Sequence, residues 1–337
     1  MRAGRRATLA EVAARAGVSK GTASKALNGR RDVGESTRRR VLDAARELDF
    51  APNSLARGLS GGRTGTVGVI TDDLDGRFVL PILMGAEDAL GAGRISVLLC
   101  NARGDSVREA AHLRTLLARG VDGLIVVGDS NEPRPALSGN VPVPVVYVYA
   151  PSADPADVSL TPDNELIGRL ATRHLLDCGR TRIAHISGEA QHRAARDRAG
   201  AVIGALGESG AELVTPPMFG DWTAAWGRAA ATLLHSRVPD VDGIICGSDR
   251  IALGVIEAIQ EQQRTVPGDV SVVGIDNWRP LAEDVKPALT TVDLGLEQLG
   301  RTAAQHIFAM LEGAAQPSGV QRLGARLIIR ESSVPVR

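Results

Sequence analysis

The chain has 337 residues, more than one ordinary hydrophobic core accommodates, so two or three compact units are expected. Its 44% hydrophobic and 23% charged residues are typical of globular domains and exclude a disordered or fibrous protein. The net charge is zero, but residues 1–65 carry 14 basic and 6 acidic side chains (+8), whereas residues 66–337 carry 25 and 33 (−8). Such segregation is expected of a protein that neutralises phosphates with one end only.

Several classes of function lack a sequence signal. No run of 18 or more apolar residues occurs, and no apolar stretch follows the first arginines, so we expect a cytoplasmic protein. Cys100, Cys178 and Cys246 have no metal-ligand spacing and are expected to be reduced core thiols. The six histidines show neither ligand nor triad spacing, and no Gly-x-Gly-x-x-Gly or His-Glu-x-x-His pattern occurs. We therefore expect no enzymatic activity, no metal and no cofactor.

The first predicted helix begins with a capping box. The Thr8 hydroxyl can accept a hydrogen bond from the backbone amide three residues on, while the Glu11 side chain reaches back to the amide of Thr8. Val12 and Ala16 fall on one apolar stripe, and the helix stops at Gly17, which can adopt the left-handed conformation.

A second helix is predicted over residues 20–28, with Ser19 as its N-cap and Ala23 and Ala26 on its inner face. Its outer face is small or hydrogen-bonding, which suits entry into a major groove. The alternative is a generic three-helix bundle whose basic face is only solvated. The residues of this module expected at DNA are Thr8, Ser19, Lys20, Gly21, Thr22, Ser24, Lys25 and Asn28.

A third helix is predicted near residues 35–48, with an apolar stripe that includes Val41 and Leu48 and with arginines at 38–40 outside. After Pro52, residues 53–59 indicate one short helix capped by Asn53. So short a helix is marginal alone because nucleation is costly, and we expect it to form mainly on DNA.

From Thr8 to Leu59 the sequence, TLAEVAARAGVSKGTASKALNGR and then RRRVLDAARELDFAPNSLARGL, resembles the headpiece of the LacI/GalR family of bacterial regulators. The resemblance continues essentially to the carboxyl terminus. It implies a helix-turn-helix headpiece over 1–52, a hinge helix and linker over 53–65, and an effector-binding and dimerisation domain over 66–337.

The resemblance also implies that Leu59 wedges into the minor groove at the operator centre, with Asn53, Ala56 and Arg57 nearby. Ordinary packing of Leu59 against the following domain is the alternative. Lys25 stands where the family usually has arginine, and lysine donates to a guanine edge without the bidentate fork.

From residue 66 onward, short β-rich apolar runs alternate with helical patterns, which predicts parallel sheets. Two successive sets indicate two similar α/β subdomains, which the resemblance identifies as the periplasmic-binding-protein-like fold, with a doubly wound sheet in each lobe. It implies an amino-terminal lobe of about 66–163 and 293–322 and a carboxyl-terminal lobe of about 164–290 and 323–337. The predicted strands are 66–70, 95–99, 124–127, 145–148, 182–186, 244–246 and 272–275.

An effector is expected in the cleft between these lobes, at the carboxyl ends of the strands. By resemblance, the family contacts effector with carboxylates, which accept from hydroxyls, with a guanidinium, which donates to them, and with a sugar-stacking tryptophan. The residues expected at the effector are Phe78, Tyr149, Arg198, Trp222, Ser248, Asp249 and Asp276.

Structural roles are the alternatives for these side chains. Asp249 and Asp276 would cap the following helices, Trp222 would be half-buried core, and Arg198 would form a surface ion pair. Ser248 stands where asparagine is commoner in the family, and Tyr149 where aspartate is frequent.

Because one helix-turn-helix reads only a half-site, we expect a homodimer on a pseudo-palindromic operator of double-stranded DNA. The resemblance implies a transcriptional regulator, by family default a repressor, controlled by a sugar or sugar derivative, with a nucleoside or purine as the alternative effector. A secreted sugar-binding receptor would share the sensor fold, but it would carry a signal peptide where residues 8–59 stand.

Overall fold

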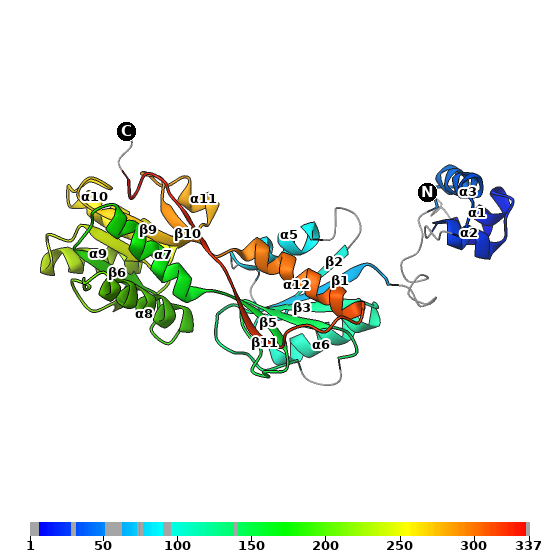
Figure 1. Ribbon diagram of the computed structural model, residues 1–337, viewed down its shortest axis with the longest axis horizontal. Helices are drawn as coiled ribbons and strands as arrows, with labels where there is room; N and C mark the ends of the chain where they lie inside the picture. The colour runs from blue at the N-terminus through cyan, green and yellow to red at the C-terminus, as the bar shows by residue number, and fades with distance from the viewer. Residues whose placement is uncertain are drawn as a thin grey trace. The chain divides into compact units, whose positions relative to one another are not determined.

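The computed structural model describes residues 7–27, 32–50, 63–72, 74, 77–89, 96–137 and 141–334. The chain divides into two compact units, residues 1–65 and 66–337 (Figure 1). Asn28 and the expected hinge-helix residues Asn53, Ala56, Arg57 and Leu59 lie outside the described residues.

The described residues of the first unit form three helices, α1 (Leu9–Arg15), α2 (Lys20–Leu27) and α3 (Glu35–Glu47). They enclose a small core in which Val12, Ala23 and Val41 are fully buried. The expected capping box is present, because the Glu11 amide donates to the Thr8 hydroxyl and the Thr8 amide to the Glu11 carboxylate.

The turn between α1 and α2 is a Schellman motif. Gly17 has φ +66, the Val18 amide donates to the Ala13 carbonyl, and the Gly17 amide donates to the Ala14 carbonyl. Ser19 then opens α2, because its hydroxyl accepts from the Thr22 amide at 3.1 Å. The caps and the turn of this helix-turn-helix are therefore those that the local sequence predicts.

The second unit has two α/β lobes, as the sequence predicts. Each lobe is built on a six-stranded sheet, whereas the sequence indicates four strands in the first lobe and three in the second. The sheet of the amino-terminal lobe is wholly parallel, with the order β11-β5-β4-β3-β1-β2. Its strands are β1 (Thr66–Thr71), β2 (Ser96–Asn101), β3 (Gly123–Val127), β4 (Val145–Val148), β5 (Val158–Pro162) and β11 (Gly319–Leu323). The helices of this lobe are α5 (Val79–Asp88), α6 (Ser106–Ala118) and α12 (Leu296–Leu311).

The sheet of the carboxyl-terminal lobe has the order β12-β10-β9-β8-β6-β7, and only the β10–β12 pair is antiparallel. Its strands are β6 (Ile183–Ser187), β7 (Met218–Phe219), β8 (Gly243–Cys246), β9 (Ser271–Asp276), β10 (Thr290–Asp293) and β12 (Arg326–Ile328). Its helices are α7 (Asn164–Asp177), α8 (Arg193–Glu208), α9 (Ala224–Arg237), α10 (Asp249–Glu261) and the short α11 (Arg279–Ala282).

Three segments connect the lobes, after β5, after β10 and after β11 (Figure 1). Helix α12 follows the second crossing and returns to the amino-terminal lobe, where it packs against α5. The close approach of these helices requires glycine at position 300, because a Cβ there would lie 1.8 Å from the carbonyl oxygen of Ile82. None of the described helices combines the length and apolarity needed to cross a membrane.

Candidate functional site

The outer face of α2 is polar and open to solvent, as the sequence predicts. Lys20, Gly21 and Lys25 are exposed and Thr22 and Ser24 are half-buried, whereas Ala23 and Ala26 on the opposite side are buried. Thr8, at the start of α1, is also exposed. The face therefore offers hydroxyl and ammonium groups of the kind that contact base edges and phosphates.

Lys25 forms an exposed ion pair with Asp32, with Nζ and Oδ2 2.6 Å apart. More than half of each side chain is accessible, so the pair contributes only about 0–1 kcal/mol. An acceptor atom of DNA can therefore take the place of the Asp32 carboxylate beside Lys25 with little loss of free energy.

Residues 17–21 also match the Gly-x-Ser-x-Gly pattern of a hydrolase nucleophile elbow. That function requires a strand before the serine and a helix after it. Here Ser19 lies between two helices and its hydroxyl caps α2, so the pattern has a structural role.

A cavity of about 170 Å³ lies between the lobes of the second unit, and five of the seven residues expected at an effector line it. They are Phe78, Tyr149, Arg198, Trp222 and Asp276. The other lining residues are Arg77, Asp129, Ser130, Asn131, His192 and Ala194. Both lobes therefore contribute to one polar and aromatic site, which we call the effector cavity.

The wall from the amino-terminal lobe is aromatic. The rings of Phe78 and Tyr149 stack with centroids 4.3 Å apart, and the Arg77 guanidinium lies over the Phe78 ring at 4.8 Å. Burial raises the pKa of the Tyr149 hydroxyl above its ordinary value, so this group stays protonated at neutral pH.

Arg77 also reaches across to the other lobe. One of its terminal nitrogens lies 2.5 Å from Oδ2 of Asp276, whose side chain is 2% exposed. Burial raises the pKa of Asp276, and the opposing charge of Arg77 lowers it in part. The other oxygen, Oδ1, has no hydrogen-bond partner within the described residues, so it can still accept from a ligand.

Arg198 is almost fully buried at 2% exposure. Its Nε donates to Oδ1 of Asn164 at 2.9 Å and one terminal nitrogen donates to the Gly247 carbonyl at 2.8 Å. The other terminal nitrogen is buried without a partner in the described part of the chain. Its burial excludes the alternative of a surface ion pair, and the unpaired donor is suited to a ligand oxygen.

Trp222 is half-buried, and its indole nitrogen donates to Nδ1 of His192 at 2.6 Å. The ring lies on Gly188, where a Cβ would approach the indole to 2.1 Å. The indole is thus fixed on both its edge and its face, and it lines the cavity without filling it.

Ser248 and Asp249 are fully buried and do not line the effector cavity. Ser248 caps α10, because its hydroxyl accepts from the Ile251 amide at 3.3 Å. Asp249 accepts from the Thr291 hydroxyl at 2.5 Å and from the Trp278 amide at 2.7 Å, and burial raises the pKa of this carboxyl well above its ordinary value. Because Trp278 follows two residues after Asp276, Asp249 holds the turn that carries Asp276. The expected effector contact of Ser248 and Asp249 stays a prediction.

Two cavity residues have strained backbones. Tyr149 has φ +73 and Asp276 has φ +122, in regions that residues other than glycine rarely adopt. The Asn131 side chain donates to the Tyr149 carbonyl at 2.8 Å and helps to hold it. Strained residues of this kind cluster at ligand sites, where the surrounding structure fixes them.

Arg77, Asn131 and His192 line the effector cavity but are not among the residues predicted from the sequence. The position of Asp129, Ser130 and Asn131 directly after β3 was an available signal, because the carboxyl ends of parallel strands face the cleft. His192 gives no comparable signal, since its role depends on Trp222, thirty residues away.

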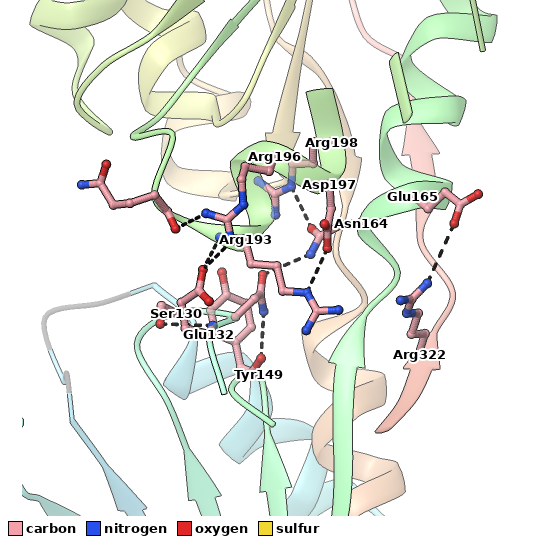
Figure 2. A network of polar contacts seen from close by, with 12 residues as sticks. Ser130, Glu132, Tyr149, Asn164, Glu165, Arg193, Arg196, Asp197, Arg198 and Arg322 are labelled. Atoms are coloured by element: carbon pink, nitrogen blue, oxygen red, sulfur yellow. Dashed lines mark hydrogen bonds and ion pairs between the residues drawn. The ribbon is translucent and has the colours of Figure 1, made fainter. Parts of the chain in front are cut away.

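A carboxylate of one lobe caps a helix of the other (Figure 2). Helix α8 begins at Arg193, and His192 gives its amino terminus no side-chain cap. Glu132, from the loop after β3, accepts from the Arg193 amide and lies 3.3 Å from a terminal nitrogen of Arg196. A negative charge at a helix amino terminus stabilises it through the unpaired amides and the helix dipole.

Replacement of Glu132 by alanine is expected to speed hydrogen exchange at the Arg193 amide by roughly 5- to 30-fold, because loss of a cap costs about 1–2 kcal/mol. Exchange measured by NMR on the effector-free protein checks this. Glu212→Ala, at an exposed position outside α8 and the effector cavity, is the matched control. Equal exchange rates in the two variants would show that Glu132 does not cap α8.

Among the described residues, no group of three or more histidine, cysteine or acidic side chains is placed to hold a metal ion. The three cysteines are free.

Two family models match the chain. Residues 8–53 match the model described as bacterial regulatory proteins, lacI family, and residues 172–333 match a periplasmic binding protein-like domain. The chain is 32% identical to catabolite control protein A of Priestia megaterium, over 97% of this chain and 99% of that protein. It is 33% identical to the ribose operon repressor of Escherichia coli K12, over 96% and 98%. A crystal structure of the lac repressor dimer bound to operator and the anti-inducer ONPF superimposes with a TM-score of 0.77 at 27% identity, over 98% of this chain and 100% of that one.

Proposed function

The chain belongs to the LacI family of bacterial regulatory proteins, and we propose that it represses transcription under the control of a sugar or sugar derivative bound in the effector cavity. The observation that carries the effector class is the pair of unsatisfied polar groups in this cavity. Arg198 has a buried donor with no partner in the described part of the chain, and Oδ1 of Asp276 is a buried acceptor with none, while Oδ2 pairs with Arg77. A polyol has neighbouring hydroxyls that can accept from the first and donate to the second.

The aromatic lining supports the same class. The indole of Trp222 offers an apolar face to the C–H face of a sugar ring, and the Phe78–Tyr149 stack provides a second aromatic wall. The relative whose name specifies a ribose operon is consistent with a sugar-responsive site. A nucleoside or purine is the second candidate, because the same aromatic faces could stack on a base.

DNA binding is assigned to the exposed face of α2, from Lys20 to Lys25. One such face reads a half-site, so a two-fold dimer reads a pseudo-palindrome whose half-sites lie about one helical turn, roughly 34–36 Å, apart. We propose a cytoplasmic location with this function, because the family regulates transcription from bacterial DNA.

The proposed control is a shift between two lobe arrangements. Arg77 and Asp276 join the lobes across the cavity, and an entering polyol competes with Arg77 for the Asp276 carboxylate. The lobes then adopt a different angle, and the headpieces of the dimer change their spacing. Reciprocity requires that operator alter effector affinity by the same factor by which effector alters operator affinity.

A thermal-shift screen of sugars, sugar derivatives, nucleosides and purines is expected to identify a sugar that stabilises the protein. A ligand at 100 times its Kd adds about 2.7 kcal/mol to the free energy of unfolding. The same sugar should change operator affinity in a gel-shift titration.

The variant Trp222→Ala should abolish the stabilisation, whereas Leu233→Ala, at an exposed apolar residue of α9 outside the cavity, should retain it. If only nucleosides or purines stabilise the protein in the screen, the effector is of that class and not a sugar. A stabilising compound that leaves operator affinity unchanged would contradict control through this cavity.

A further inference from the structure

A second and larger cavity, of about 560 Å³, lies on the side of the lobe junction where the first and third crossings run. Its walls are the end of β5 with the first turn of α7, part of β11, and one face of α8. We call it the crossover cavity. Asn131 lines both this cavity and the effector cavity, so the two sites share a wall.

Guanidinium groups from both lobes border the crossover cavity. Arg322 comes from β11 of the amino-terminal lobe, and Arg193 comes from α8 of the carboxyl-terminal lobe. Arg169 also borders it, but both of its terminal nitrogens bind Glu208 at 2.7 Å. Arg322 and Arg193 are therefore the two arginines that remain to bind an anionic group of a ligand.

Neither of these two arginines is strongly engaged. Arg322 faces Glu165 across 3.9 Å, which is too long for a hydrogen bond (Figure 2). Arg193 uses only Nε toward Asp197, at 3.4 Å, and within the described residues its terminal nitrogens have no hydrogen bond. Both side chains are about half exposed, so their present ion pairs contribute little free energy. Each guanidinium can therefore turn toward an incoming anion.

The face of α8 toward this cavity leaves room for a ligand. No heavy atom lies within 4 Å of a Cβ position at Gly200 or Gly204. Thr161 and Asn164 add polar groups to the lining, and Val320 is its largest apolar side chain. The volume falls within the range of about 300–1,000 Å³ typical of small-molecule sites, but the lining favours a hydrophilic ligand.

We propose that the crossover cavity is a second ligand site, which takes a small phosphorylated polyol whose phosphate bridges Arg193 and Arg322. Two guanidinium groups match the double negative charge of a phosphate monoester and the geometry of its oxygens. Glu165 and Asp197 are placed to accept from hydroxyls of the same ligand.

A ligand that bridges Arg193 and Arg322 joins the two lobes independently of the effector cavity. It also lies beside the hydrogen bond between Asn164 and Asn131, 3.3 Å long, which connects the lobes next to Arg198. Binding of this ligand is therefore expected to change the affinity for effector. By reciprocity, effector changes the affinity for this ligand by the same factor.

The test is calorimetric titration of the full-length protein with glycerol 3-phosphate, ribose 5-phosphate and glucose 6-phosphate, and with inorganic phosphate, ribose and glucose. At least one monoester is expected to bind more tightly than inorganic phosphate and than its own phosphate-free sugar. Arg193→Gln/Arg322→Gln should weaken it by at least about 30-fold, because charge-assisted bonds from both lobes are lost. Arg114→Gln/Arg237→Gln removes one exposed positive charge from each lobe outside both cavities and should have little effect.

Trp222→Ala distinguishes binding in the two cavities, because Trp222 lines only the effector cavity. This variant should bind the monoester with unchanged affinity. Loss of that binding in Trp222→Ala but not in Arg193→Gln/Arg322→Gln would assign the ligand to the effector cavity and overturn the proposal. Equal affinity for inorganic phosphate would indicate an adventitious ion only, which also overturns it, as does the absence of binding by all three monoesters. None of these outcomes depends on which sugar fills the effector cavity.

Discussion

Replacing Arg198 with glutamine is expected to weaken effector binding by about 30-fold to several thousandfold. Arg198 is buried in the wall of the effector cavity and has one donor with no partner among the described residues. Truncation of a buried charge that hydrogen-bonds to a partner costs about 2–5 kcal/mol. The measurement is a calorimetric titration with the sugar identified by the thermal-shift screen.

Arg237→Gln is the matched control for this result. Arg237 is an exposed arginine at the end of α9, away from the cavity, and its loss should leave the effector Kd unchanged. Arg198→Lys, which keeps the positive charge, should recover part of the affinity if the variant is folded. Because Arg198 also binds Asn164 and Gly247, thermal unfolding of each variant is measured alongside. An Arg198→Gln protein that is folded and retains full effector affinity would remove this residue from the site.

Replacing Lys25 with alanine is expected to produce the largest loss of operator affinity among single changes in the described headpiece. A good contact with a base edge is worth about 1–3 kcal/mol, and a dimer loses it in both half-sites, so the total loss is roughly 2–6 kcal/mol. The ion pair with Asp32 offsets little of this, because it is exposed. Fluorescence anisotropy with operator and with random duplex measures both affinities.

The two duplexes distinguish a base contact from a phosphate contact. A base contact predicts that Lys25→Ala weakens operator binding and leaves random-duplex binding nearly unchanged. A phosphate contact would weaken both equally and reduce the salt dependence by about one ion per half-site. Lys286→Ala, at an exposed lysine of the second unit, is the control and should change neither affinity. A Lys25→Ala protein with unaltered operator affinity would contradict a role of this lysine in reading DNA.

The headpiece could be predicted closely because its signals are local. The capping box at Thr8, the positive φ of Gly17 and the cap at Ser19 each involve residues within five positions of one another, and all are present. The second helix was expected over residues 20–28 and spans Lys20–Leu27, with Asn28 outside the described residues. The fold class of the second unit was also predicted, since alternating strands and helices indicate parallel sheets.

The site could be predicted only in part, because strand ends fix where a residue lies but not where its side chain points. Asp276 was expected just after a strand and is the last residue of β9, with its carboxylate in the cavity. Asp249 follows β8 in a similar way, yet its carboxylate turns inward to Trp278 and Thr291. Arg77 and Glu132 depend on partners in the opposite lobe, and no local pattern marks such pairs.

Whether the exposed face of α2 reads DNA sequence is tested by selection from a random duplex library. The full-length protein selects at moderate salt, with and without the effector. We expect enrichment of a pseudo-palindrome, to an extent that the effector changes. The enrichment should be lost when Lys20, Thr22 and Lys25 are all replaced by alanine. Recovery of unselected sequence by the unaltered protein in both conditions would contradict it.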